Sequence, residues 1–266
     1  MPIHYKKEDH IVLITIDRYE RRNSFDVEHG SQMIDCWIRF RDDPDAWVAI
    51  VTGVKNVFCA GGDLKVMGQI AQELAETGSS ETEKAMNGYG RGSITLKGMN
   101  IFKPIIAAVN GYCMAGGMEL LGGTDIRIAS TEAIFSITEP RRGLFAGGGT
   151  TARLPRQLAW PAAMEMLLVA GNTTAQRAFQ IGLVNEVVEP HELLDAAYRW
   201  ATEITKNAPL AVQGTKKSAL LGLAASSLAE AFQIENQCAH EVFSTEDAQE
   251  GPKAFFEKRQ PVWSGR

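Results

Sequence analysis

Hydrophobic positions along the chain alternate between short apolar runs and longer stretches with helical spacing. Residues 11–16 and 47–52 are apolar and rich in β-branched side chains, which predicts two buried strands. Between them, apolar residues recur at helical spacing over 27–38, behind the cap-type residues Asn23 and Ser24. The first part of the chain is therefore predicted to form a strand, a helix and a second strand.

The middle of the chain repeats a strand, a glycine turn and a helix. Residues 104–111 predict a third buried strand, and a helix is expected over 116–121 after the turn. Shorter strands are expected over 125–129 and 133–136. The pattern favours an α/β fold in which glycine turns follow buried strands.

Beyond residue 150 helical patterns dominate, apart from a strand expected at 183–188. The Ala- and Leu-rich stretch 220–228 suits a helix covered on several sides, either by another subunit or by the chain's own core. The polar segment 75–83 is expected to be a mobile surface loop. The predicted helices span residues 193–207, 211–223, 227–243 and 251–259.

Composition limits the class of protein. A chain of 266 residues with 45% hydrophobic content favours one large α/β core with a helical appendage. No apolar run approaches the roughly 18 residues that cross a bilayer, and the first residues lack a secretory signal. The expectation is a cytoplasmic protein with no membrane partner. A formal charge of -5 argues against a nucleic-acid partner.

The four cysteines are scattered, with no CxxC pair, so neither a zinc site nor a disulfide framework is expected. Reduced thiols packed as small apolar groups are the better prediction.

Two glycine-rich turns and two glutamates are the candidate chemistry. The turns at 60–63 and 115–117 each follow a predicted strand and let backbone N–H groups approach a developing oxyanion. Glu119 lies one helical turn beyond the second glycine turn, and Glu139 follows a short apolar strand. Two carboxyls at one site can divide the roles of general acid and general base.

Each feature also has a structural explanation. The glycines are explained by turn formation, and Glu119 by a favourable interaction with the positive end of a helix. Glu139 would then be a surface glutamate paired with Arg141 or Arg142. The joint presence of both turns and both glutamates favours the functional interpretation.

A series of motifs along the chain resembles the crotonase, or enoyl-CoA hydratase and isomerase, superfamily. The motifs are Arg22-Asn23-Ser24-Phe25, Phe58-Cys59-Ala60-Gly61-Gly62-Asp63-Leu64, Lys103 to Tyr112, Ala115-Gly116-Gly117-Met118-Glu119-Leu120 with Asp125, Glu139 before Gly143, and Ala254-Phe255-Phe256-Glu257-Lys258-Arg259. The resemblance implies a ββα spiral core over 1–195 and a C-terminal helical trimerisation region over 196–266. It also implies acyl-CoA thioester substrates and a homotrimer or a dimer of trimers.

Carried over by motif, the resemblance assigns the oxyanion N–H groups to Gly62 and Gly116, and hydratase chemistry to Glu119 and Glu139. Glu119 is expected to activate water and Glu139 to protonate C2. No metal and no cofactor are expected, since coenzyme A is part of the substrate. The glycine run 147–149 is expected to support the active-site wall. The residues expected to bind the substrate are Arg22, Phe58, Ala60, Asp63, Leu64, Lys65, Phe255 and Lys258.

Three alternatives remain open from the sequence. The first is enoyl-CoA isomerisation, which needs an enolate and one carboxyl but no added water. The second is a specialised hydratase, such as one acting on crotonobetainyl-CoA. The third is an acyl-CoA-binding oligomer without turnover.

Overall fold

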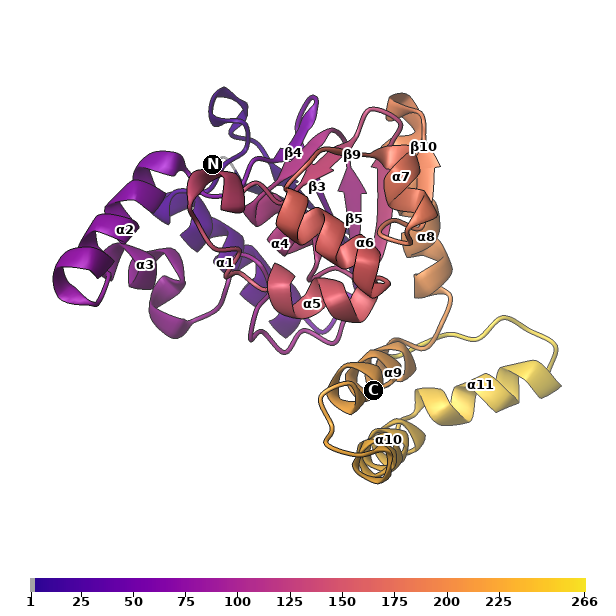
Figure 1. Ribbon diagram of the computed structural model, residues 1–266. Coiled ribbons are helices and arrows are strands. Elements are labelled where there is room, and N and C mark those ends of the chain that lie inside the picture. The colour runs from indigo at the N-terminus through magenta and orange to yellow at the C-terminus, as the bar shows by residue number, and fades with distance from the viewer. Residues whose placement is uncertain (1–2) are drawn as a thin grey trace.

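A computed structural model describes residues 3–266, and its centre is a six-stranded sheet (Figure 1). The strand order is β1-β2-β3-β5-β7-β10. All neighbouring strands are parallel except β1 and β2, which form an antiparallel hairpin at one edge. The strands are β1 (Ile3–Glu8), β2 (Ile11–Ile16), β3 (Val48–Gly53), β5 (Ile105–Val109), β7 (Ile126–Ser130) and β10 (Glu186–Val188).

A second, smaller sheet contains the strands that lead into the two glycine turns. Its order is β4-β6-β8-β9, with strands β4 (Val57–Cys59), β6 (Tyr112–Met114), β8 (Ile134–Ser136) and β9 (Thr173–Thr174). Each of β4, β6 and β8 directly follows a strand of the large sheet, and helices α2 (Leu64–Thr77) and α4 (Gly116–Leu121) follow β4 and β6. This strand-strand-helix repeat confirms the predicted ββα spiral core.

The hydrophobic core lies on both faces of the large sheet. On one face, α1 (Val27–Asp42) buries Trp37 and Phe40 completely against the strands. On the other, α8 (Leu193–Thr205) packs small side chains, including Ala197 and Ala201, against β3, β5 and β7. Helix α8 spans the predicted division at 195 and 196, and in packing terms the whole helix belongs to the core.

The prediction of a mobile loop at 75–83 is wrong. The segment contains the end of α2, a turn at Gly78, and the start of α3 (Glu81–Met86). The Glu73 carboxylate organises the turn, because it accepts hydrogen bonds from the Ser80 hydroxyl at 2.6 Å and from the Thr82 N–H at 3.1 Å. A polar composition therefore marks an exposed helical corner rather than disorder.

The remaining helices of the core are shorter, and the sequence patterns did not single them out. They are α5 (Thr150–Gln157), α6 (Trp160–Met164) and α7 (Ala175–Gln180). All four cysteines are free thiols, as predicted, and three of them are buried. No helix within residues 3–266 combines the length and the apolar character needed to span a bilayer.

The last three helices extend away from the core as an arm, which we define as residues 209–266 (Figure 1). Helices α9 (Pro209–Gly222) and α10 (Leu228–Phe243) pack against each other, and α11 (Asp247–Phe256) continues the arm. All were predicted, with boundaries displaced by a few residues. The arm exposes large apolar side chains: Leu220, Leu221, Leu223, Leu228, Phe232, Phe243, Phe255, Phe256 and Val262.

Candidate active site

The two glycine turns meet backbone to backbone, although more than fifty residues separate them in the chain. A Cβ placed on Gly61 would lie 2.7 Å from the Gly116 nitrogen, and one placed on Gly116 would lie 3.4 Å from the Gly62 nitrogen. Gly61 also has a φ of 98°, a left-handed conformation that favours glycine. The contact therefore requires residues without side chains on both turns.

The N–H groups of Gly62 and Gly116 are free donors. Neither donates a hydrogen bond to any other of residues 3–266, whereas the N–H groups of Gly61, Asp63 and Ala115 are bonded. Ala115, immediately before Gly116, has a strained φ of 50°, and its N–H bonds the Ser136 carbonyl at 2.9 Å. The turn is thus fixed, while the N–H of Gly116 is not used within it. This geometry suits the binding of an oxyanion.

Glu119 projects from α4 and is only 9% exposed. One carboxylate oxygen accepts the N–H of Gly148, and the Arg153 guanidinium donates to the Glu119 carbonyl at 3.2 Å. Burial, together with the nearby Glu139 charge, raises the pKa of Glu119 to about 7. At neutral pH this carboxyl can therefore both hold and release a proton.

Glu139 follows β8 and is 8% exposed. Its Oε2 atom is buried without a hydrogen-bond partner among residues 3–266. Burial raises the pKa of Glu139, opposed by its own N–H and by the Arg142 charge. The alternative of a surface glutamate paired with an arginine is excluded, since Glu139 is buried and, among residues 3–266, forms no ion pair with Arg141 or Arg142.

The glycine run 147–149 forms a wall against Glu119. A Cβ on Gly148 would lie 2.4 Å from one carboxylate oxygen of Glu119, so no side chain fits there. Two residues from the long segment after α3 hold the run in place. Thr95 donates to the Gly148 carbonyl at 2.6 Å and Lys97 to the Gly147 carbonyl at 2.8 Å.

Sequence reasoning missed these supporting residues. Arg153 also reaches the Thr95 carbonyl at 2.7 Å, which links the wall, Glu119 and the 93–97 segment. The glycine run was the only available signal, since contacts between residues 34 to 58 positions apart leave no periodic pattern.

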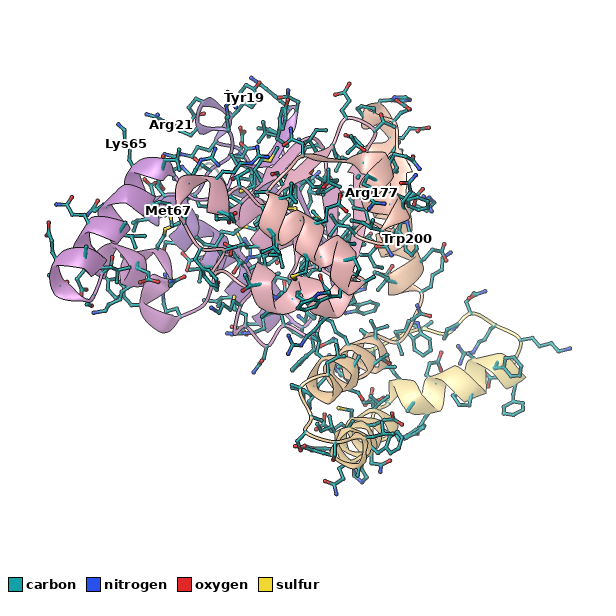
Figure 2. The ribbon with its side chains drawn as sticks, viewed as in Figure 1. Tyr19, Arg21, Lys65, Met67, Arg177 and Trp200 are labelled. Carbon is teal, nitrogen blue, oxygen red and sulfur yellow. The ribbon has the colours of Figure 1, made fainter. Side chains whose placement is uncertain are left out.

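The predicted substrate-binding residues fall into three groups. The side chains of Arg22, Leu64 and Lys65 are exposed, and Ala60 is partly buried. Lys65 lies on the same edge of the molecule as Tyr19 and Arg21, beside Met67 (Figure 2). A cation at the start of α2 and the cations of the segment at residues 21–22 therefore lie near the first glycine turn.

The residues of the second group, Phe58 and Asp63, make structural contacts within the protein. The Phe58 side chain is fully buried in the core, so it contributes packing rather than a contact surface. Asp63 caps α2 by accepting the Lys65 N–H at 3.1 Å, and it pairs with Arg18 at 3.2 Å. The sequence alone did not separate these structural roles from binding.

Met67 and Met86 lie beside Gly62. A Cβ on Gly62 would be 2.8 Å from the Met67 sulfur and 3.8 Å from the Met86 methyl group. Flexible thioethers at this position suit an apolar wall of adaptable shape.

Phe255 and Lys258 are not brought to this site within one chain. Both side chains are exposed, and α11 lies at the far end of the arm, away from α2 and β4 (Figure 1).

The family described as Enoyl-CoA hydratase/isomerase matches residues 6–266. This chain belongs to that family. The predicted resemblance is therefore confirmed.

Other family members are similar over their full length. The (E)-benzylidenesuccinyl-CoA hydratase of Thauera aromatica is 38% identical over 100% of both chains. The carnitinyl-CoA dehydratase of Proteus mirabilis is 35% identical over 99% of this chain and 98% of its own. A crystal structure of an enoyl-CoA hydratase from Mycobacterium tuberculosis superposes with a TM-score of 0.88 and 34% identity, over 100% of this chain and 99% of the other.

Proposed function

We propose that this enzyme adds water reversibly to 2-enoyl-CoA thioesters, giving 3-hydroxyacyl-CoA. The observation that carries the proposal is the pair of buried carboxyls, Glu119 and Glu139, with raised pKa values at one site. Isomerisation needs only one such group, whereas addition of water needs a proton removed from water and a proton delivered to carbon. Family membership and similarity to named hydratases support the same reaction.

The thioester oxygen would accept hydrogen bonds from the N–H groups of Gly62 and Gly116. These donors are already oriented and unpaired, so they stabilise the enolate without reorganising. Polarising the carbonyl draws electron density from C3, which makes conjugate addition of water feasible there.

The two carboxyls then share the proton transfers. Because they interact, they titrate as one unit. The ionised carboxyl takes a proton from water as its oxygen attacks C3, and the protonated one delivers its proton to C2. We assign the first role to Glu119 and the second to Glu139, and the roles reverse in dehydration.

Coenzyme A would lie along the edge that carries Ala60, Leu64 and Lys65, with Arg22 near the same turn. Exposed cations there suit the phosphates of the substrate. The proposed reaction uses no metal and no cofactor besides the coenzyme A of the substrate, and we expect it to take place in the cytoplasm.

The proposed assembly is a homotrimer or a dimer of trimers. The exposed apolar side chains of the arm need cover, and Phe255 and Lys258 can contribute to a coenzyme A site only on a neighbouring subunit. The arm would thus serve as subunit contact and pocket wall together.

Incubation with a panel of short, medium, branched and polar-substituted 2-enoyl-CoAs tests the function. Hydration removes the absorbance of the conjugated thioester, and mass spectrometry identifies a product heavier by one water. A product of unchanged mass with a displaced double bond would identify an isomerase instead. No change with any substrate would contradict the proposal.

A further inference from the structure

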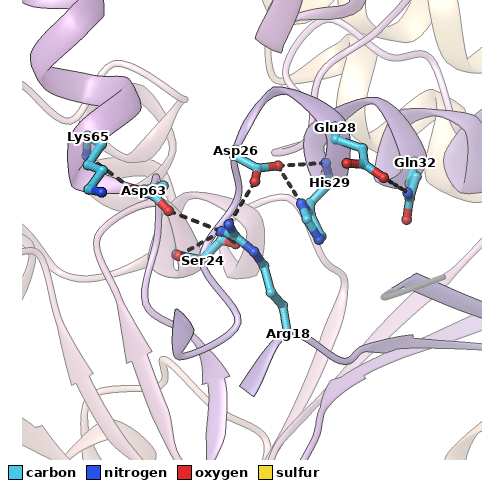
Figure 3. A network of polar contacts seen from close by, with 8 residues as sticks. All are labelled: Arg18, Ser24, Asp26, Glu28, His29, Gln32, Asp63 and Lys65. Atoms are coloured by element: carbon cyan, nitrogen blue, oxygen red, sulfur yellow. Dashed lines mark hydrogen bonds and ion pairs between the residues drawn. The ribbon is translucent and has the colours of Figure 1, made fainter. Parts of the chain in front are cut away.

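A cluster of charged residues joins the two helices that flank the first glycine turn (Figure 3). The Arg18 guanidinium lies between two carboxylates, 2.7 Å from Asp26 and 3.2 Å from Asp63. Its side chain is only 11% exposed, and it also donates to the Ser24 carbonyl at 3.0 Å. A guanidinium presents donors in a rigid fork, so it fixes the separation of its partners.

Both carboxylates are also helix caps. Asp26 accepts the N–H of His29 at 2.9 Å at the start of α1, and Asp63 accepts the N–H of Lys65 at 3.1 Å at the start of α2. Arg18 therefore ties together the first turns of two helices that are separated by strands β3 and β4 along the chain.

Gly62 lies between these two tied points. Phe25, next to Asp26, forms a parallel bridge with Gly62. The Phe25 N–H donates to the Gly61 carbonyl at 2.8 Å, and the Asp63 N–H donates to the Phe25 carbonyl at 2.8 Å. The peptide that carries the Gly62 N–H is thus held on both sides by the strand-like segment that Arg18 anchors.

Removing the Arg18 charge would leave two partly buried carboxylates facing each other. Their side chains are 24% and 16% exposed, so water screens their repulsion only in part. The expected relaxation separates Asp26 from Asp63, and this movement turns the Gly62 peptide between them.

We propose that Arg18 is a positioning residue for the reaction, which aims the Gly62 N–H at the thioester oxygen by holding the caps of α1 and α2 together. The inference rests on the proposed function of Gly62. Arg18 itself touches no reacting atom, and it acts through Phe25 and Asp63.

The test compares Arg18→Met, Arg18→Lys and a matched control. Removal of one oxyanion donor typically lowers kcat by about 10²- to 10³-fold, so a misdirected donor in Arg18→Met should lower it by about 10- to 100-fold. Lysine contacts one carboxylate at a time and should recover part of this loss. The control is Arg177→Met, which removes an exposed ion pair with Glu165 and should keep the kcat of the unmodified enzyme.

Two further readouts separate positioning from general damage. Butyryl-CoA labelled with ¹³C at the thioester carbonyl is not hydrated, and its C=O stretch falls in frequency when N–H groups bind the oxygen. In Arg18→Met this shift should shrink, while the dissociation constant of free coenzyme A stays within about threefold. If Arg18→Met does not fold, Asp63→Asn replaces it, because the amide oxygen keeps the cap and loses the charge. It should lower kcat several-fold.

Unchanged kcat or an unchanged carbonyl shift in Arg18→Met would overturn the positioning role, as would unchanged kcat in Asp63→Asn where that variant is needed. A lower kcat with a weakened affinity for free coenzyme A and a full carbonyl shift would also overturn it. Failure of the unmodified enzyme to hydrate any 2-enoyl-CoA would instead overturn the proposed function.

Discussion

The core and the arm differ in how far they bury their large apolar side chains. In the core, Trp37, Phe40 and the central strands are fully buried, and the two glutamates and two glycine turns meet within one chain. In the arm, nine large apolar side chains remain exposed, among them Phe243, Phe255 and Phe256. The core therefore brings its candidate catalytic groups together in one chain, whereas the arm leaves its large apolar side chains uncovered.

The largest effect is expected when the two candidate catalytic carboxyls of the core are replaced. Glu119→Gln and Glu139→Gln should each lower the hydration rate by at least roughly a hundredfold, because a general acid or base contributes about 10²- to 10⁴-fold. The measurement is kcat with the best substrate of the panel. The double variant should lose less than the product of the single losses, since both groups act on one addition. Near-normal rates in both single variants would show that neither glutamate acts as a general acid or base in the reaction.

A smaller effect is expected from the wall beside Glu119. In Gly148→Ala the new Cβ would overlap the Glu119 carboxylate, which must move away from its position, so kcat should fall by about tenfold to a hundredfold. Gly147→Ala is the matched control, because its Cβ meets only Phe145 at an ordinary 3.6 Å. Equal rates in the two variants would show that the position of Glu119 is not set by this wall.

The arm is tested by deleting residues 251–266. The deletion removes most of α11 with Phe255 and Lys258, so acyl-CoA should bind about tenfold more weakly, and the oligomer should loosen. Calorimetry gives the affinity and sedimentation gives the mass. A truncated protein that keeps its oligomeric state and its affinity for acyl-CoA would show that α11 is only a peripheral cap.

The smallest effect concerns stability and sharpens the account of the core. Because the folded-state pKa of Glu119 is raised to about 7, the folded protein binds this proton more tightly than the unfolded chain does. The free energy of unfolding therefore falls as pH rises through the range between the ordinary carboxyl pKa and about 7, by at most about 3 kcal/mol.

Glu119→Gln removes the fall in the free energy of unfolding that ionisation of Glu119 causes. The variant should therefore have a Tm a few degrees higher than the unmodified protein at pH 8, with little difference at pH 4.5. Calorimetric melting at both pH values measures it. An equal Tm difference at the two pH values would mean that Glu119 is not the buried titrating group.

Several elements followed directly from the sequence. The strands β2, β3, β5 and β7 and the helix α8 were predicted because their apolar runs or spacings extend over at least five residues and are bounded by clear turns. The shorter elements β8 and α4 were predicted from an apolar run and from a glycine turn, respectively. The catalytic candidates were found because glycine turns after buried strands, followed by glutamates, form a local pattern. By contrast, β4 and β6, which are as short as β8, carry no period and were not predicted.

Local sequence singled out the residues that we propose to supply the chemistry: two turns that tolerate no side chain and two carboxyls at defined positions after strands. Only the tertiary structure decided how these residues are placed. It pairs Gly61 with Gly116, buries both glutamates so that their pKa values rise, assigns Asp63 and Phe58 to structural tasks, and places Phe255 far from the site of its own chain. The physical reason is that burial, mutual electrostatics and long-range contact arise from packing between segments, which no local pattern records.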